Sequence, residues 1–445
     1  MEYSVKIFFK FNIPNGIERR NKMWAEKSNF YHLYPLGLCS TQEKNCFDGN
    51  VQHNLFKIEE QIEHIKNLGI NAIYFGPLFE STAHGYDTAD YYKIDARLGD
   101  SKDFANLGKK LHQNGIKYIV DGVFNHVGRD FWAFKDVQQN RQNSIYCDWF
   151  FLDWNSNNAY NDGFSYIDWE GCNDLVKLNL KNYYVKEHLF NAIKYWVETF
   201  DIDGLRLDVA YCLDEDFMKE LHNFVKSLKP DFWLLGEAVH GDYNNIANPE
   251  MLDSVTNYEC YKGLYSSFND KNMFEIAHSV KRQENLYQGK HLYSFLDNHD
   301  VSRIASSLND KNNLKFVYSL MFTLPGVPSI YYQSEFGIEG QKSNGDKCLR
   351  PQSEYFDYND LTNHIKNLCK INSETDLFSY GKYEEISLKN EFYCFARKLN
   401  NQKAVCAVNI SDKEEYVNYE GLELKLPPKS EQIFINENCV SFEKV

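Results

Sequence analysis

Short apolar runs alternate with longer amphipathic stretches along most of the chain. Runs of about four to eight apolar residues are typical of buried strands, whereas apolar positions that recur every three or four residues are typical of helices. This pattern predicts eight strands, near residues 30–35, 71–77, 117–124, 204–209, 232–238, 253–258, 292–297 and 327–332. It predicts helices between them, near residues 56–68, 102–114, 184–200, 214–228, 271–284 and 310–322. Eight strands alternating with helices predict an α/β fold, a (β/α)8 TIM barrel.

Two segments depart from this alternation. About fifty residues rich in Trp, Asn and Asp separate the third strand from the helix near 184, and a connection that long is usually functional or a subdomain of its own. After about residue 375 the pattern changes to alternating apolar and polar positions, which is typical of an antiparallel sheet. We therefore expect a barrel formed by 1–126 and 181–374, an inserted subdomain (B) at 127–180 and a C-terminal antiparallel β-sandwich domain at 375–445.

The net charge of the chain makes some classes of binding partner unfavourable. The chain has 48 Lys and Arg against 63 Asp and Glu, a net charge of −15. This charge repels phosphate backbones and anionic lipids, so we expect neither nucleic acid nor a membrane as partner. Lys6 and Lys10 interrupt the first apolar run, which argues against a signal peptide and predicts a cytoplasmic location. The eleven cysteines include no Cys-x-x-Cys pair, which favours reduced thiols over a disulfide framework or a zinc site.

Aromatic residues make up 16% of the chain. Two interpretations of this abundance remain open. It reflects either a compositionally biased genome, since Lys, Asn and Ile are also frequent, or a sugar-binding function, because aromatic faces pack well against the C–H faces of pyranose rings.

Polar residues cluster at the predicted carboxyl ends of barrel strands, where the active sites of TIM barrels lie. They are Asp121, Asn125 and His126 after the third strand, Arg206 and Asp208 after the fourth, Glu237 after the fifth, and His299 and Asp300 after the seventh. Any one of them alone could be a buried ion pair or a helix cap. Their occurrence at equivalent ends of four strands instead favours an active site.

The spacing of these residues suggests paired carboxylates. Residues i and i+2 of a strand share a face, so Arg206 and Asp208 point the same way, and a guanidinium keeps a neighbouring carboxylate ionised. Glu237 has no basic residue within two positions, which favours a protonated acid. An ionised carboxylate beside a protonated one is the arrangement that glycoside hydrolysis requires.

Four segments resemble, in order, the signature regions of the α-amylase family, glycoside hydrolase family 13: DGVFNH, DGLRLDVA, GEAVH and FLDNHD. The resemblance implies a retaining mechanism with Asp208 as nucleophile, Glu237 as general acid/base and Asp300 as third carboxylate. It further implies that His126 and His299 bind the sugar in the cleavage subsite and that Tyr86 forms an aromatic platform beneath it. It implies that Asp121 orients Arg206. The alternative interpretation is that Tyr86 is an aromatic residue of a loop without a role in binding.

The segment from Asp174 to Asn179 is similar to an extra signature of the cyclomaltodextrinase, neopullulanase and maltogenic amylase branch. His240 resembles a residue that closes the third region in that branch. Lys177 stands where secreted α-amylases usually carry a calcium-linked aspartate, which argues against the usual calcium site. Asn125, another calcium-linked position, is retained, so calcium stays open. No cofactor is required by the chemistry, and no residue is assigned as a metal ligand.

Members of that branch carry an N-terminal β domain that builds a dimer, whereas only about 29 residues precede the first predicted strand here. Dimerisation by that route is in doubt, and the sequence leaves monomer or homo-oligomer undetermined. The resemblance predicts hydrolysis of α-1,4 bonds in maltooligosaccharides or cyclodextrins, small-molecule α-glucans. Two alternatives are a transglycosylase or α-glucoside isomerase that uses the same covalent intermediate, and a catalytically inactive glucan-binding member of the family.

Overall fold

The computed structural model of the protein describes residues 22–354, 356–436 and 438–440. Lys6 and Lys10, on which the expectation about a signal peptide depends, lie outside the described residues. None of the helices in the described part of the chain combines the length and the apolar character that a membrane span requires.

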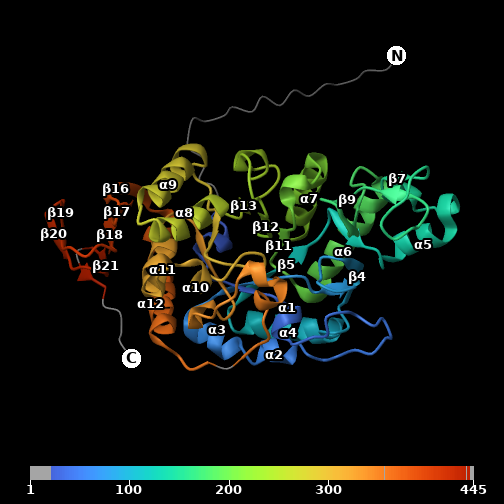
Figure 1. Ribbon diagram of the computed structural model, residues 1–445, viewed down its shortest axis with the longest axis horizontal. Helices are drawn as coiled ribbons and strands as arrows, with labels where there is room; N and C mark the ends of the chain where they lie inside the picture. Colours follow the sequence, from blue (N-terminus) through green and yellow to red (C-terminus); the bar gives the residue numbers. More distant parts are fainter. Residues whose placement is uncertain (1–21, 355, 437, 441–445) are drawn as a thin grey trace, which may run out of the picture.

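Eight parallel strands form the centre of the molecule (Figure 1). Their order in the sheet is β13-β12-β11-β5-β2-β1-β15-β14, and a parallel bridge between Thr256 and Tyr293 joins the two edges into a ring. The predicted TIM barrel is therefore confirmed. The strands are β1 (Phe30–Leu33), β2 (Ala72–Phe75), β5 (Lys117–Gly122), β11 (Gly204–Leu207), β12 (Trp233–Gly236), β13 (Ser254–Val255), β14 (Tyr293–Phe295) and β15 (Val327–Tyr331).

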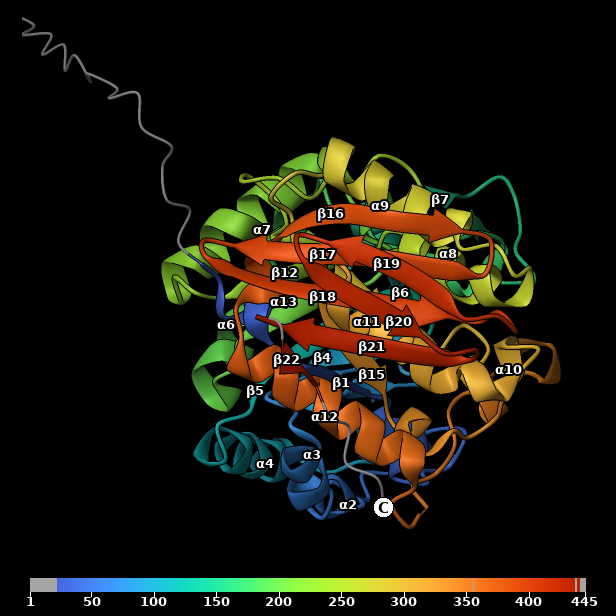
Figure 2. The ribbon, with the colours of Figure 1, turned by 90° about the vertical axis from the view of Figure 1, so that its left-hand side faces the viewer.

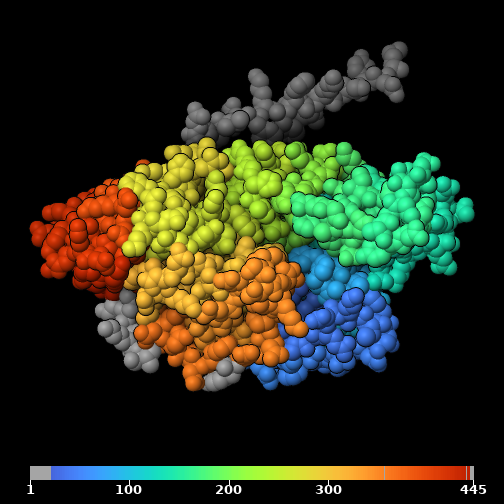
Figure 3. Space-filling model, viewed as in Figure 1, coloured from blue at the N-terminus to red at the C-terminus, as the bar shows by residue number. Residues whose placement is uncertain are grey.

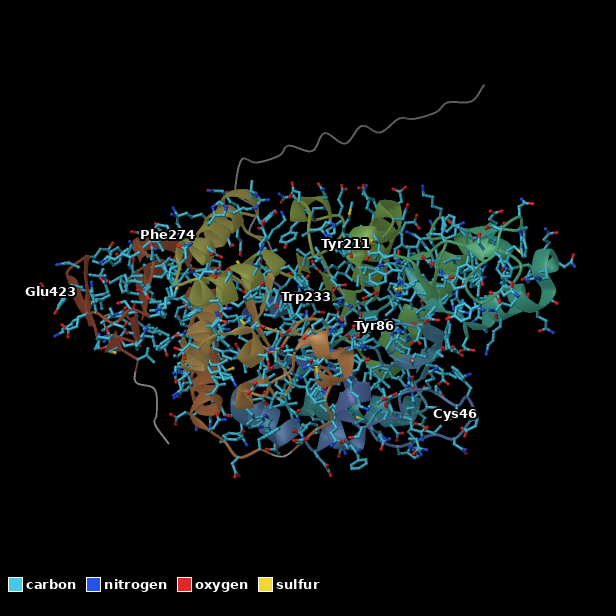
Figure 4. All side chains as sticks on the ribbon, viewed as in Figure 1. Cys46, Tyr86, Tyr211, Trp233, Phe274 and Glu423 are labelled. Atoms are coloured by element: carbon cyan, nitrogen blue, oxygen red, sulfur yellow. The ribbon has the colours of Figure 1, made fainter. Side chains whose placement is uncertain are left out.

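Aromatic side chains fill the interior of the barrel. Phe30 lies with its ring centroid 5.2 Å from that of Trp233 and 5.5 Å from that of Tyr293. All three are buried, and Trp233 lies deep in the centre of the molecule in Figure 4. Burying a large apolar side chain contributes roughly 1.5–3 kcal/mol. These rings make the barrel a packed core that supports the polar residues at its carboxyl end.

Helices surround the strands and bury their apolar faces against them. They are α2 (Phe56–Glu59), α3 (Ile62–Leu68), α4 (Ser101–Gln113), α6 (Tyr183–Phe200), α7 (Glu215–Leu228), α8 (Tyr258–Asn269), α9 (Phe274–Leu286), α11 (Leu314–Thr323) and α12 (Asp360–Glu374). The predicted helix 56–68 is broken between α2 and α3, and α8 and α12 were not predicted. The sixth strand was predicted too long, because the Asn257 side chain accepts the backbone N–H of Cys260 and starts α8 there.

The segment inserted after β5 forms a small unit of its own, at the right of Figure 1. It contains α5 (Trp132–Asn140), a three-stranded sheet of β6 (His126–Gly128), β10 (Cys172–Lys177) and β9 (Asp168–Trp169), and a hairpin of β7 (Leu152–Asp153) and β8 (Ser165–Tyr166). In the antiparallel pair of β6 and β10, Lys177 lies opposite His126. The sheet thus holds Trp169 and Cys172 beside the carboxyl end of the barrel.

The C-terminal segment forms an antiparallel sheet domain, as predicted. A five-stranded sheet of β16 (Lys382–Lys389), β17 (Phe392–Leu399), β18 (Gln402–Asn409), β21 (Ser430–Ile435) and β22 (Asn438–Cys439) packs against a hairpin of β19 (Glu415–Tyr419) and β20 (Leu422–Leu426) through a small apolar core. Figure 2 shows this sheet in front of α11, with α12 along its lower edge. Buried Arg397 on β17 donates to the carbonyl of Thr323, the last residue of α11, at 2.8 Å.

Candidate active site

Two carboxylates occupy equivalent positions at the ends of neighbouring strands. Asp208 directly follows β11, and Glu237 directly follows β12. The barrel ladder continues to both residues, because the Asp208 N–H donates to the carbonyl of Gly122 at 3.2 Å and the Glu237 N–H donates to that of Leu207 at 2.9 Å. Strand register therefore fixes both backbones and directs the two acids to the same end of the barrel.

Arg206 joins these two acids. Its Nη1 lies 2.8 Å from Asp208 Oδ1, and its Nη2 lies 2.9 Å from Glu237 Oε2. Nη1 also lies 2.9 Å from Asp121 Oδ1, so Asp121 holds the guanidinium from the adjacent strand. All four side chains are buried. No basic residue lies within two positions of Glu237 in the sequence, but the strand pairing brings Arg206 to it from 31 positions earlier.

Each acid has one oxygen held and one oxygen free. Asp208 Oδ1 is bound to Arg206, while Oδ2 makes no hydrogen bond to the described residues and lies 3.8 Å from His126 Nε2. Glu237 Oε2 accepts from Arg206 and from the backbone N–H of Val209 at 3.0 Å, while Oε1 accepts no hydrogen bond from the described residues. Both acids line the cavity described below, so each can offer its free oxygen to a ligand.

Val209 has a left-handed backbone, with φ of 40° and ψ of 48°. This conformation is rare for a β-branched residue and is energetically costly. It turns the Val209 N–H toward Glu237, and the hydrogen bond to Oε2 is the contact that results. The unusual backbone therefore helps to hold Glu237 in place.

The ionisation of the two acids is linked. Burial raises the pKa of Asp208 well above its usual range; Arg206 opposes this shift, and the neighbouring charges of Glu237 and Asp121 add to it. The pKa of Arg206 itself is raised despite its burial, because Asp121 and Glu237 favour its charged form. One guanidinium thus serves three carboxyl groups. The expectation that Arg206 alone keeps Asp208 ionised was wrong, because burial and the two neighbouring carboxyl groups outweigh the effect of Arg206 on the pKa of Asp208.

Asp300 lies in a different environment. His299 Nε2 lies 2.8 Å from its Oδ2, and Arg350 Nη2 lies 3.0 Å from its Oδ1. Although burial raises the pKa of Asp300, His299 and Arg350 outweigh that effect and hold it well below the usual range. Asp300 is therefore suited to a permanent negative charge and not to proton transfer.

Sequence reasoning missed Arg350. It lies in the irregular segment between β15 and α12, where no strand or helix pattern drew attention to it. Besides Asp300, it contacts Asp346 Oδ2 at 3.3 Å, and its guanidinium lies 4.9 Å from the ring centroid of Tyr34. The i, i+4 spacing of Asp346 and Arg350 is the only signal that the sequence offered.

The predicted aromatic and imidazole groups meet beside these acids. Tyr86 lies in the loop between β3 (Phe79–Ser81) and β4 (Thr88–Ile94), and its ring stacks on His299 with centroids 5.3 Å apart. The Tyr86 hydroxyl donates to Asp121 Oδ2 at 3.2 Å. The pKa of His126 is lowered to about 3 by burial, with His84 and Lys177 adding to the effect, so its imidazole stays neutral. His126 Nε2 is buried without a hydrogen-bond partner among the described residues.

A cavity of about 540 Å³ opens above the acids. Its lining includes Tyr86, His126, Asp208, Glu237 and Asp300, together with Trp169 and Tyr211, which sequence reasoning did not assign to the site. Tyr86 and Tyr211 both lie in the central part of the molecule in Figure 4. In Figure 3 the green and yellow barrel segments, which include the one that carries Tyr211, lie between the C-terminal domain (red) and the inserted segment (teal). The other six predicted residues do not line the cavity: Asp121, Asn125, Lys177, Arg206, His240 and His299.

His240 and Lys177 lie farther out. His240 is exposed, with its ring centroid 4.9 Å from that of Tyr211, so it lies next to a lining residue without lining the cavity itself. Lys177, at the end of β10, is half-buried.

The residues around Asn125 do not fit a calcium ion. Asn125 Oδ1 is buried without a hydrogen-bond partner among the described residues, but one such oxygen does not make a site for calcium, which prefers six to eight oxygens. Lys177 contributes a positive charge on the adjacent strand instead of an oxygen ligand. Among the described residues, the one group of three potential ligands is His53, Asp100 and Asp103, at the start of α4. Those two aspartates already cap that helix.

The chain is similar to known proteins along most of its length. The family described as alpha amylase, catalytic domain, matches residues 45–378. A cyclomaltodextrinase of Thermoanaerobacter pseudethanolicus is 32% identical over 84% of this chain, which spans 66% of that relative. A maltogenic alpha-amylase of Bacillus acidopullulyticus is 31% identical over 89% of this chain and 71% of its own length. Among solved structures, the acarbose-soaked debranching enzyme of Nostoc punctiforme has a TM-score of 0.82 at 27% identity, covering 92% of this chain and 98% of that one.

Proposed function

Because the chain belongs to the α-amylase family of glycoside hydrolases, we propose that it cleaves α-1,4-glucosidic bonds in short maltooligosaccharides or cyclodextrins with retention of configuration. The observation that carries the proposal is the pair of acids on one guanidinium, Asp208 and Glu237 on Arg206, at the base of a cavity. Two carboxyl groups that share a charge partner and differ in their remaining contacts are suited to the two roles of a retaining glycosidase.

Asp208 is the nucleophile of the proposed reaction. Its free Oδ2 attacks the anomeric carbon and forms an ester to the sugar, while Arg206 holds Oδ1 and stabilises the ionised form. His126 Nε2, 3.8 Å from Oδ2, has no partner among the described residues and is available to a sugar hydroxyl.

Glu237 is the acid and then the base. Its free Oε1 gives a proton to the glycosidic oxygen as the bond to the leaving sugar breaks. In the second step Oε1 takes a proton from the water that attacks the ester, which releases the sugar and restores Asp208. Arg206 and the Val209 N–H hold Oε2 through both steps, so the proton moves at one defined oxygen.

Asp300 completes the site as a fixed negative charge. Both of its oxygens are bound by cationic or imidazole groups, and its pKa is lowered. It therefore stays ionised while the sugar acquires positive charge in the transition state, and it accepts hydrogen bonds from sugar hydroxyls. Tyr86, stacked on His299, offers an aromatic face to the same ring.

The substrate class in this proposal is supported by relatives named cyclomaltodextrinase and maltogenic alpha-amylase. The test is to incubate the protein with maltotriose, maltoheptaose, β-cyclodextrin, pullulan and trehalose, and to follow products by chromatography and anomer-resolved NMR. We expect maltose or glucose from the first three substrates, released as α-anomers. Products longer than the starting oligosaccharide would indicate a transglycosylase, and activity on trehalose alone would contradict the proposal.

The proposal also covers the calcium requirement and the location of the protein. The protein works without calcium, since Lys177 stands beside Asn125 where a further oxygen ligand would be needed. It acts in the cytoplasm on imported short glucans, and fractionation of the source cells with detection of the intact chain tests that location.

A further inference from the structure

A second cavity, of about 610 Å³, lies on the outside of the barrel. It opens between α3 and the segment that follows β15, and it shares no lining residue with the catalytic cavity. We propose that this cavity is a second, non-catalytic binding site for the glucose units of an α-glucan. The inference rests on the proposed function for the choice of sugar, but its geometry is independent of the catalytic acids.

The floor of the second cavity is a buried polar cluster. The hydroxyl of Tyr31, on β1, donates to Glu335 Oε1 at 2.7 Å, and His64 Nε2, on α3, lies 2.7 Å from the same oxygen. Tyr31 and Glu335 are buried, and His64 is 16% exposed at its side chain. Glu335 therefore fixes two of the lining side chains from beneath, and the shape of the floor is set before a ligand arrives.

Gln333 supplies a hydrogen-bonding group to this floor. Its backbone is left-handed, with φ of 67°, and its N–H donates to the Tyr31 hydroxyl at 3.1 Å. A left-handed conformation is costly for a residue other than glycine, so the surrounding contacts must hold it. Gln333 is buried and lines the cavity, yet its amide oxygen accepts no hydrogen bond from the described residues. A sugar hydroxyl is a suitable donor for it.

Aromatic rings form one wall. Phe336 lies with its centroid 5.0 Å from that of Phe356, and His64 stacks on Phe336 with centroids 5.3 Å apart. Tyr358 is 39% exposed, and its hydroxyl lies 2.9 Å from His64 Nδ1. Flat aromatic faces beside hydrogen-bonding groups are what the apolar face and the hydroxyl edge of a pyranose require.

The remaining lining groups favour a ligand rich in hydroxyl groups over an anion. They are carboxylates, amides and a hydroxyl: Glu60, Gln61, Asn67, Ser353 and Glu354. No Lys or Arg is among the described residues that line this cavity, so a phosphate or another anion would meet no ammonium or guanidinium group there. Carboxylates and amides accept hydrogen bonds from hydroxyl groups, which a glucan offers in abundance. A polyamine is the alternative that these acids would also attract, and the experiment distinguishes it.

The test uses the full-length protein carrying Glu237→Gln, which slows turnover enough for isothermal titration with maltotetraose. We expect two binding sites per chain. Adding Tyr358→Ala should remove one of them or weaken it at least tenfold, and Phe336→Ala should do the same if the first change proves too mild. Tyr416→Ala, which removes a 64% exposed tyrosine from β19, is the matched control and should leave both sites intact.

Two results would overturn the inference: one site in the Glu237→Gln protein, or two sites that survive both aromatic changes. Tighter binding of spermidine than of maltotetraose, abolished by Tyr358→Ala, would replace the sugar by a cation. Failure of the proposed function is a separate outcome, since it would appear as absence of hydrolysis by the unmodified protein, whatever the effect of Tyr358→Ala on binding.

Discussion

Asp208, Glu237 and Asp300 have different proposed roles because their carboxyl oxygens make different contacts. Asp208 and Glu237 each give one oxygen to Arg206 and keep the other free, whereas both oxygens of Asp300 are bound. A free oxygen is required to attack carbon or to carry a proton, whereas a carboxylate with both oxygens bound to cationic or imidazole groups contributes a fixed charge and accepts further hydrogen bonds. At the scale of single residues, hydrogen bonding therefore separates chemically identical groups into different roles.

Replacing Glu237 by glutamine tests its role as acid. Glutamine keeps the size and the contact with Arg206 but has no proton to give, so hydrolysis of maltotriose should fall by roughly 10³-fold. An aryl α-glucoside with a good leaving group needs little protonation, and its first step should be much less affected. Rate measurements on both substrates check this, and equal losses on the two would count against Glu237 as the acid.

Replacing Asp121 by asparagine should move the pH profile. The negative charge of Asp121 raises the pKa of Asp208, and Asp121 also binds Arg206 Nη1. Removing the charge of Asp121 therefore lowers the pKa of Asp208. Because the nucleophile must be ionised, activity is lost as pH falls through that pKa, and the acid limb of kcat/KM should shift to lower pH by about one unit. The exposed Asp412→Asn is the control. An acid limb that stays in place, or moves to higher pH, would refute the linkage.

At the scale of elements, the sequence identified all eight barrel strands because each is a short run buried on both faces. The sequence pattern did not predict the end of the sixth strand, because a single hydrogen bond from the Cys260 N–H to the Asn257 side chain sets the start of α8 there. The acids were found from their places at strand ends. The contact of Arg206 with Glu237 and the role of Arg350 were not found, because they depend on strand register and on an irregular segment far away in sequence.

The pairing of β6 with β10 leads to a prediction about metals. Lys177 lies opposite His126, the residue after Asn125, so the neighbouring strand offers a positive charge and not a further oxygen ligand. We expect treatment with EDTA to change activity and melting temperature little. Activity assays before and after dialysis check this, and a large loss that calcium reverses would reveal a site elsewhere.

The contact between β21 and the barrel helices predicts a pH-dependent stability. Burial raises the pKa of Glu431, on β21, to about 7 from its ordinary 4.5. Its Oε1 lies 3.4 Å from His364 Nε2 on α12, and its Oε2 is buried without a partner among the described residues. The folded protein therefore keeps a proton that the unfolded chain releases between these pH values, so stability falls as pH rises through that range.

Glu431→Gln should remove this decline. The unmodified protein should lose on the order of 3 kcal/mol of unfolding free energy between pH 4.5 and 7 relative to the variant. Urea unfolding at several pH values measures it. Glu423→Gln, at an exposed position of β20, serves as control and should follow the unmodified protein. Parallel pH curves for Glu431→Gln and the unmodified protein would show that Glu431 does not titrate in this way.

At the scale of the whole molecule, the catalytic cavity of the barrel lies between two segments that are not part of the barrel sheet. The inserted segment provides Trp169 and Cys172 to the cavity lining, and the segment after β15 provides Asp346 and Arg350 from the other side. The C-terminal domain packs against the ends of α11 and α12 through Arg397 and Glu431 and contributes no residue to that lining. Cleavage in this arrangement depends on the barrel and the two segments that border the cavity.

Trapping the covalent intermediate tests the central claim most directly. A 5-fluoro-α-glucosyl fluoride forms the sugar ester quickly and releases it slowly, because the fluorine disfavours the charged transition state while fluoride leaves readily. Mass spectrometry of the digested protein should then show one added sugar per chain, on the peptide that contains Asp208. A label on the peptide with Glu237 or Asp300, or hydrolysis to β-anomers with no label at all, would contradict the account.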